Sequence, residues 1–153
     1  MNLHLNLNPP PASMDLIHAP IPRHDQGVLE VLLRADRLTL AKRRWRGTAE
    51  DGREFGFDLA EPLADATPFF YIDGTTYLIA QQPEPVMELA LASPAESARL
   101  GWLIGNLHFS LETTGDVIRV AADSALRQMF LREHISFSEC SRVFHPYGHG
   151  HLH

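Results

Sequence analysis

The sequence predicts an α+β protein made of a small all-β N-terminal domain, a ferredoxin-like βαββαβ C-terminal domain and a flexible His-rich tail. Asp-Gly turns separate short apolar runs between residues 28 and 82, which is typical of β-hairpins. A polar, proline-marked joint at 81–85 follows, and strand and helix patterns then alternate through 83–144. The last residues, 145–153, are rich in histidine.

Residues 1–27 are expected to form a loose N-terminal arm with one edge strand near Ile17. Proline fixes φ and lacks a backbone donor, so it disfavours helix here. The prolines of this arm are Pro9, Pro10, Pro11, Pro20 and Pro22.

The N-terminal domain, 28–82, is predicted to be all-β. Asp51-Gly52 and Asp73-Gly74 mark two hairpin turns. Alternation of apolar and polar residues in 37–42 predicts a half-buried strand there. The other expected strands cover 28–33, 54–59, 68–72 and 76–80.

The C-terminal domain, 83–144, contains two helix starts with a stereochemical cause. Ser93-Pro94-Ala95-Glu96 combines an N-cap serine, a proline at the first helical position and a capping-box glutamate, so a helix should run to about Asn106. Asp123 is the expected N-cap of a second helix over 124–133. Apolar residues near helical spacing are the expected core-facing positions of the two helices: Ala95, Ala98, Trp102 and Leu103 in the first, and Leu126, Met129 and Phe130 in the second. The expected strands cover 86–91, 109–112, 117–120 and 135–144.

Composition excludes several classes of protein. The net charge is −6 with 44% hydrophobic residues, which argues against a general nucleic-acid binder and against disorder. A basic run in 34–46 could bind an acidic partner, although a solvated strand face is the simpler interpretation. The single cysteine, Cys140, rules out an intramolecular disulfide and a four-cysteine zinc site. No signal peptide and no apolar run of ~18 residues is present, so we expect a cytoplasmic protein without a membrane partner.

Catalytic motifs are missing from the sequence. It contains neither Gly-x-Ser-x-Gly, nor a phosphate-binding glycine loop, nor His-Glu-x-x-His. Cys140 falls inside a predicted strand and is expected to be a buried structural thiol. We therefore expect no enzymatic activity.

Histidines carry the chemistry that the sequence does suggest. His108 directly follows the expected end of the first helix, and His145, His149, His151 and His153 are four of the chain's nine histidines. Neutral imidazole binds Ni²⁺, Cu²⁺ and Zn²⁺. A single imidazole at 108 holds no transition metal tightly, so interaction with the helix dipole is the simpler interpretation of His108. Metal binding there needs a symmetry mate on a two-fold axis, and the tails of both chains could then complete the ligand set.

Three local patterns, at 44–54, 105–108 and 123–129, resemble the urease accessory protein E family of nickel metallochaperones. Gly105-Asn106-Leu107-His108 is similar to the family's Gly-Asn-Arg-His, and 123–129 is similar to its Asp-His-x-Leu-x-x-Met-Leu helix. The pair Arg44-Trp45-Arg46 and Asp51-Gly52-Arg53-Glu54 looks like the family's Arg-x-Arg and Asp-Gly-x-Glu strands. The resemblance as a whole spans roughly residues 28–153, and the His-rich tail is also a habit of the family.

The resemblance implies a homodimer formed through the C-terminal domain, with His108 of each protomer meeting to bind Ni²⁺, or Zn²⁺ or Cu²⁺ in its place. It implies delivery of nickel to apo-urease, with the apo-urease complex and the urease accessory GTPase as partners. The tail histidines His145, His149, His151 and His153 would be further metal ligands.

Departures from the family pattern lie close to the site. Leu107 replaces the usual arginine, Ser124 stands where many members have histidine, and Val120-Ala121-Ala122 lacks the histidines of some members. His134, at the end of the second helix, is expected to be structural. Two alternatives to nickel delivery stay open: a scaffold that binds peptides or proteins, and a zinc-storage protein.

Overall fold

The computed structural model describes residues 13–23 and 29–148 of the chain. It is a mixed α+β protein that divides into two compact units, with the boundary between Gln82 and Pro83. No helix in these two stretches combines the length and the apolar character that crossing a bilayer requires.

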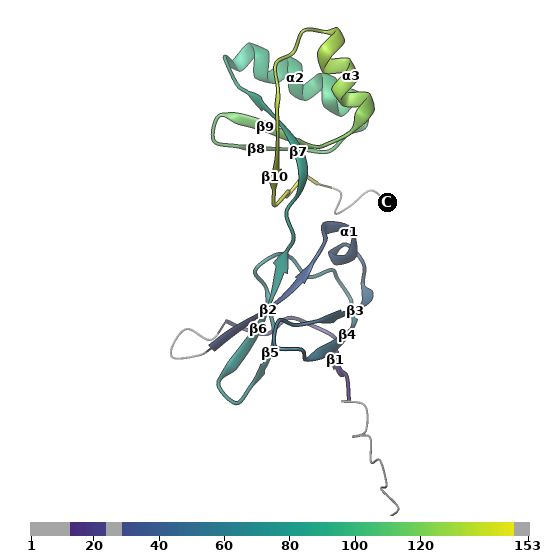
Figure 1. Cartoon of the computed structure of the whole chain (residues 1–153), viewed down its shortest axis with the longest axis vertical. Helices are drawn as coiled ribbons and strands as arrows, with labels where there is room; N and C mark the ends of the chain where they lie inside the picture. Colours follow the sequence, from purple (N-terminus) through teal and green to yellow (C-terminus); the bar gives the residue numbers. More distant parts are fainter. Residues whose placement is uncertain (1–12, 24–28, 149–153) are drawn as a thin grey trace, which may run out of the picture. The chain divides into compact units, whose positions relative to one another are not determined.

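The N-terminal unit is built from two three-stranded sheets (Figure 1). In each sheet one outer pair is parallel and the other is antiparallel. The first sheet has the order β1 (Asp15–Ile17), β4 (Glu54–Asp58), β3 (Arg44–Thr48), and the second β2 (Leu29–Ala35), β6 (Thr75–Gln81), β5 (Pro68–Ile72). The edge strand expected near Ile17 is confirmed as β1, so part of the predicted arm belongs to a sheet.

Aromatic rings from both sheets form the core of this unit. Phe55 on β4 packs edge-to-face against Phe69 on β5, with ring centroids 5.0 Å apart. Phe55 also meets Tyr77 on β6 at 5.1 Å. Aromatic pairs of this geometry add stability beyond the area they bury, so the two sheets are joined mainly by these rings.

The strand predicted over 37–42 is wrong. Residues Arg37–Leu40 form the short helix α1, whose N-cap Asp36 accepts hydrogen bonds from the backbone N–H and the hydroxyl of Thr39, both at 2.8 Å. Leu40 is buried and Leu38 is exposed. Two leucines two positions apart fit one turn of helix as well as a strand, so the apolar pattern alone does not distinguish the two. The Asp36 cap favours the helix.

Both predicted hairpin turns are confirmed. β3 and β4 flank Asp51-Gly52, and β5 and β6 flank Asp73-Gly74. Asp73 and Gly74 both have positive φ, 47° and 76°, which matches the right-handed twist of a two-residue hairpin.

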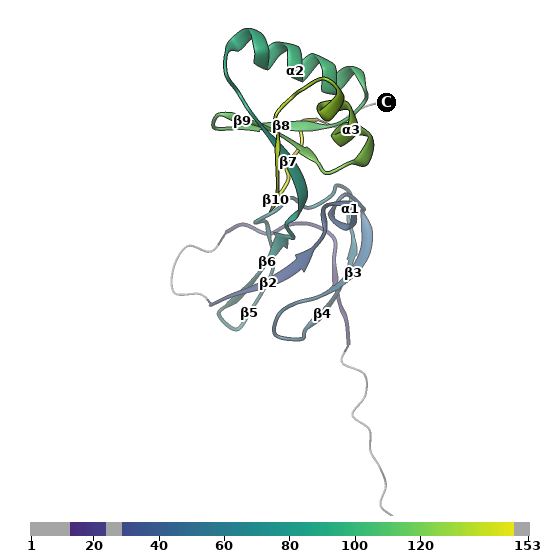
Figure 2. The same cartoon turned by 45° about the horizontal axis from the view of Figure 1, so that its top comes forward.

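The C-terminal unit has the element order β-α-β-β-α-β, and its four-stranded sheet has the order β10-β7-β9-β8 with all pairs antiparallel. This is a ferredoxin-like arrangement. Figures 1 and 2 show α2 and α3 side by side on one face of the sheet. The bounds are β7 Glu84–Ala90, α2 Pro94–Asn106, β8 Leu111–Thr114, β9 Val117–Ala121, α3 Ser124–Arg132 and β10 Ser138–Arg142.

Both helices begin where the sequence predicts. The Ser93 hydroxyl accepts from the Glu96 N–H at 3.2 Å, while the Glu96 carboxylate forms an ion pair with Arg99 at 3.0 Å. The Asp123 carboxylate accepts from the N–H groups of Ala125 and Leu126 at 2.8 and 3.0 Å. The predicted apolar face of α3, which comprises Leu126, Met129 and Phe130, is buried.

The expected apolar face of α2 needs correction. Leu100 and Ile104 are the buried residues of this helix, and the side chain of Trp102 is 67% exposed. Helical periodicity places residues 100 and 104 on one face and turns 102 to the opposite one. The last strand is also shorter than expected, because only Ser138–Arg142 of 135–144 pairs with β7.

Candidate metal site at the end of helix α2

His108 lies immediately beyond helix α2, in a Schellman motif. The His108 N–H donates to the Gly105 carbonyl at 2.9 Å, and the Phe109 N–H donates to the Ile104 carbonyl at 3.2 Å. His108 itself adopts a left-handed conformation with φ 64°, a position where glycine is preferred. Phe109, the next residue, packs against the core of the unit. The backbone of the exposed imidazole is therefore fixed on both sides.

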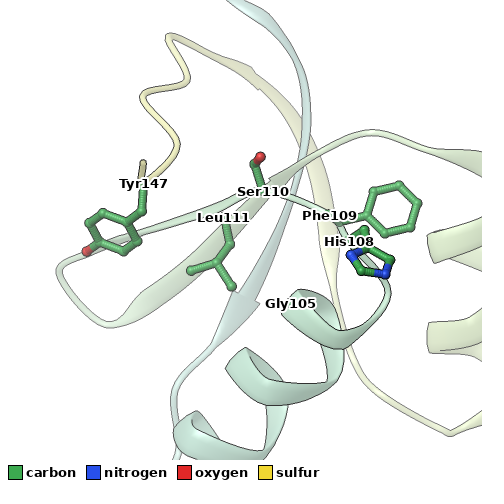
Figure 3. Close-up of a pocket in the computed structure, with 6 residues that line it drawn as sticks. All are labelled: Gly105, His108, Phe109, Ser110, Leu111 and Tyr147. Carbon is green, nitrogen blue, oxygen red and sulfur yellow. The ribbon is translucent and has the colours of Figure 1, made fainter. Parts of the chain in front are cut away.

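A shallow pocket of about 300 Å³ opens beside His108 (Figure 3). In this view the side chain of Leu111 lies between Tyr147 and the end of α2. The lining is mainly apolar, with one imidazole and one phenol ring. The lining residues are Gly105, His108, Phe109, Ser110, Leu111 and Tyr147.

Tyr147 reaches this pocket because the root of the tail, residues 144–147, runs along strand β8. The Tyr147 N–H donates to the Leu111 carbonyl at 2.8 Å, and its hydroxyl contacts the hydroxyl of Thr113. The N–H of His145 donates to the Glu112 carboxylate at 3.1 Å. Phe144, at the start of the root, is 1% exposed.

Glu112 belongs to a row of charges that crosses the sheet. Its carboxylate pairs with Arg119 on β9 at 2.5 Å, and Arg119 also pairs with Glu88 on β7 at 2.9 Å. The three side chains are 10–13% exposed. Buried charges need partners of opposite sign, so removal of one member would leave the others uncompensated.

Cys140 ends this row on β10, and its predicted burial needs correction. The residue is half-buried, because β10 is an edge strand of the sheet. Its thiol donates to the Glu88 carboxylate at 2.8 Å. This hydrogen bond, together with burial, raises the pKa of Cys140 above its ordinary value. The thiol holds the pKa of Glu88 low, and Arg119 acts in the same direction.

The structure places two of the predicted ligands, His108 and His145, and both are exposed. His149, His151 and His153 lie outside the described residues. Within 13–23 and 29–148, no group of three or more histidine, cysteine, aspartate or glutamate side chains is arranged to hold a metal ion. One described histidine at the pocket, His108, therefore needs ligands from elsewhere.

Sequence reasoning missed Tyr147, Glu112 and Thr113 as neighbours of the candidate site. Tyr147 lies between His145 and His149 in the sequence, which indicated that it belongs to the tail but did not indicate which residues it contacts. Its pairing with β8 depends on strand order, because the root of the tail follows β10 and contacts the opposite edge of the sheet.

Comparison with the sequences of known proteins identifies the family of this chain. The sequence model of "UreE urease accessory protein, C-terminal domain" matches residues 84–153. The urease accessory protein UreE of Nitrosococcus oceani is 30% identical over 116 residues, covering 72% of this chain and 70% of that protein. The chain belongs to the urease accessory protein UreE family.

A second UreE protein, from Ralstonia nicotianae, is 28% identical over 148 residues and covers 89% of this chain. It is matched along 69% of its own length. A UreE from a Synechococcus strain is 37% identical over a shorter stretch of 57 residues. The protein is thus a urease accessory protein, and the UreE C-terminal domain is the part that carries His108.

Proposed function

We propose that this UreE family member is a nickel metallochaperone that delivers Ni²⁺ to apo-urease during urease maturation. The observation that best supports this proposal is the position of His108. Its exposed imidazole lies on a fixed backbone, in a pocket shared with the root of the His-rich tail. Nickel is the cargo of this protein, not a resident cofactor. Imidazole suits Ni²⁺, and also Zn²⁺ or Cu²⁺ in its place.

A homodimer would complete the site at His108. One imidazole supplies one ligand, so a two-fold axis beside the end of α2 would bring two imidazoles to one ion. The exposed face of α2 supports this arrangement, because it carries Ala98, Trp102 and Gly105 next to the pocket. Exposed apolar patches of this kind mark interaction surfaces. Water would fill the remaining coordination positions and keep the ion exchangeable.

The tail would collect the metal. His145, His149, His151 and His153 offer imidazoles on a glycine-containing chain, which can fold around an ion at some entropic cost. The collected ion would pass to the His108 pair and then to apo-urease, with the urease accessory GTPase as the second partner. All of these steps would take place in the cytoplasm.

Calorimetric titration with Ni²⁺ tests the metal sites. We would compare the intact chain, His108→Ala, a variant with His145, His149, His151 and His153 replaced by serine, and His134→Ala as the matched control. The serine variant keeps Tyr147 and the chain length. We expect it to lose the weaker equivalents, His108→Ala to lose the tightest one per dimer, and His134→Ala to bind like the intact protein. Unchanged tight binding in His108→Ala would contradict the site.

Activation of apo-urease at limiting nickel tests delivery separately. The intact protein, added with the urease accessory GTPase, should raise urease activity, and His108→Ala should raise it less. A chain that binds Ni²⁺ but leaves activation unchanged would instead favour storage or a scaffold role. Competition with Zn²⁺ in the same assay distinguishes zinc storage from nickel carriage.

A further inference from the structure

The root of the tail is held against β8 by four contacts that come from three consecutive residues of that strand. The carbonyl of Leu111 accepts the Tyr147 N–H at 2.8 Å, the carboxylate of Glu112 accepts the His145 N–H at 3.1 Å, and the Thr113 hydroxyl meets that of Tyr147. The Thr113 N–H also donates to the Tyr147 hydroxyl at 3.4 Å. We call this set of five residues the tail clamp.

The clamp carries the chain across the sheet. The tail follows β10, which is one edge of the order β10-β7-β9-β8, and the clamp holds it at the other edge. Burial of Phe144 fixes the start of this crossing. Since β8 follows α2 after a short connection, the clamp brings the tail to the strand whose first residue, Leu111, lines the His108 pocket.

Glu112 is a buried residue that holds an exposed segment. It is only 8% exposed, whereas His145, whose N–H it accepts, is exposed. One carboxylate oxygen faces Arg119 and the other accepts the His145 N–H. A charged acceptor makes a stronger hydrogen bond than a neutral one. The ion pair with Arg119 fixes the carboxylate, so the clamp rests on the rigid interior of the sheet.

We propose that the tail clamp fixes the root of the His-rich tail beside the pocket of His108 on the same chain, which makes Glu112, Thr113 and Tyr147 positioning residues for metal transfer. This inference rests on the proposed function. His153 is the sixth residue after Tyr147, so every later histidine stays within about 20 Å of Tyr147. Tethering at that range gives an effective concentration on the order of millimolar at the pocket without any new metal ligand.

A metal-free measurement tests the clamp itself. Amide hydrogen exchange of the full chain should show His145 and Tyr147 exchanging at least about tenfold more slowly than Gly148, whose N–H lies outside the clamp. Thr113→Val should speed exchange at Tyr147, and Thr114→Val, the matched control on the same exposed end of β8, should leave it unchanged. Equal exchange at residues 145, 147 and 148 would overturn the clamp whatever the metal does.

A second measurement tests positioning, with Cu²⁺ as a paramagnetic probe on the full chain carrying His108→Ala. Copper bound by the tail should broaden the amide signals of 110–113 more than those of 94–96, which lie at the opposite end of α2 from the pocket. Tyr147→Pro removes both the N–H and the hydroxyl of the clamp and keeps every tail histidine. It should abolish this selective broadening while the bound equivalents stay the same.

The two possible failures of this second measurement are distinguishable. Tail-bound copper with the same broadening in Tyr147→Pro would overturn the clamp and leave the proposed function standing. Loss of all copper binding in His108→Ala would contradict the tail as a collector, and would overturn both. Glu112 is left unchanged, because its removal would also take a partner from the half-buried Arg119 and confound folding with positioning.

Discussion

His108 and His134 occupy equivalent positions beyond the two helices of the C-terminal unit. Each is the left-handed residue of a Schellman motif, with φ 64° and 55°. The His134 N–H donates to the Leu131 carbonyl at 3.3 Å, and the Ile135 N–H donates to the Phe130 carbonyl at 2.8 Å. Glycine is the usual residue at this position, so histidine at either helix end makes the fold less stable than glycine would.

Replacement of either histidine by glycine should therefore stabilise the fold. A left-handed conformation costs an L-residue roughly 1 kcal/mol relative to glycine, so we expect His108→Gly and His134→Gly each to raise the free energy of unfolding by about 0.5–1 kcal/mol. Urea denaturation measures this change.

Nickel titration then separates the two variants. Only His108→Gly should lose tight Ni²⁺ binding, because His134 is not among the residues that line the pocket and serves here as the internal control. If both substitutions instead destabilised the fold, the imidazoles would be stabilising the helix ends. The histidine at position 108 would then be explained by stability and not by function.

Trp102 provides a test of the proposed dimer surface. Its side chain is 67% exposed on α2, and that of Leu131 is 62% exposed on α3. We expect Trp102→Asp to weaken the dimer by about 2 kcal/mol or more, roughly 30-fold in dissociation constant, because a two-fold interface contains the substitution twice. Sedimentation equilibrium measures it.

Leu131→Asp is the matched control for this substitution, since it places the same charge on an equally exposed residue of the other helix. It should leave the dimer intact. A dimer broken by Leu131→Asp and not by Trp102→Asp would move the interface from α2 to α3, away from His108.

Cys140 should react slowly with alkylating reagents. The hydrogen bond to Glu88, together with burial, raises the pKa of this thiol, and only the thiolate is nucleophilic. Glu88→Gln removes the negative charge that opposes ionisation, so the thiol pKa should fall and iodoacetamide should modify Cys140 faster at pH 8. Since the chain has one cysteine, the rate of modification reports on this site alone. Slower modification in Glu88→Gln would contradict the assigned cause.

Acid should weaken the C-terminal unit through Glu88. The hydrogen bond from Cys140, supported by Arg119, holds the pKa of Glu88 below the ordinary value of about 4.3. A carboxylate with a lowered folded-state pKa contributes stability above the unfolded value, and that stability is lost as the pH falls through the folded-state pKa.

The difference in unfolding free energy between the wild type and Glu88→Gln should thus be largest near neutral pH and shrink below about pH 4.3. Urea denaturation at a series of pH values measures it. Cys140→Ser, which keeps a donor to Glu88, should preserve the pH dependence. A difference that stays constant into acid would contradict the contribution of the ionised carboxylate.

The local features of this fold could be predicted from the sequence. Ser93 and Asp123 cap helices, Asp51-Gly52 and Asp73-Gly74 turn hairpins, and the β-α-β-β-α-β order follows from short-range patterns of apolar residues. Each of these signals depends on residues that lie close together along the chain, so a single sequence is enough to recognise it. The same is true of the exposed position of His108 after α2.

Two errors show where local patterns stop being sufficient. In 37–42, two leucines fit either a strand or one helical turn, and the Asp36 cap decided between them. In α2, an apolar run concealed which residue faced solvent, and only packing on the sheet assigned Ile104 to the core and Trp102 to the surface.

The sequence by itself determined the caps, the turns, the order of elements and the positions of the histidines along the chain. Only the tertiary structure decided that Tyr147 shares a pocket with His108 and that Glu112 holds the root of the tail. These contacts depend on β8 and β10 being opposite edges of one sheet. The packing of the whole unit sets the strand order. The energy that a strand gains by pairing depends on its neighbours in space, and these are not its neighbours along the chain.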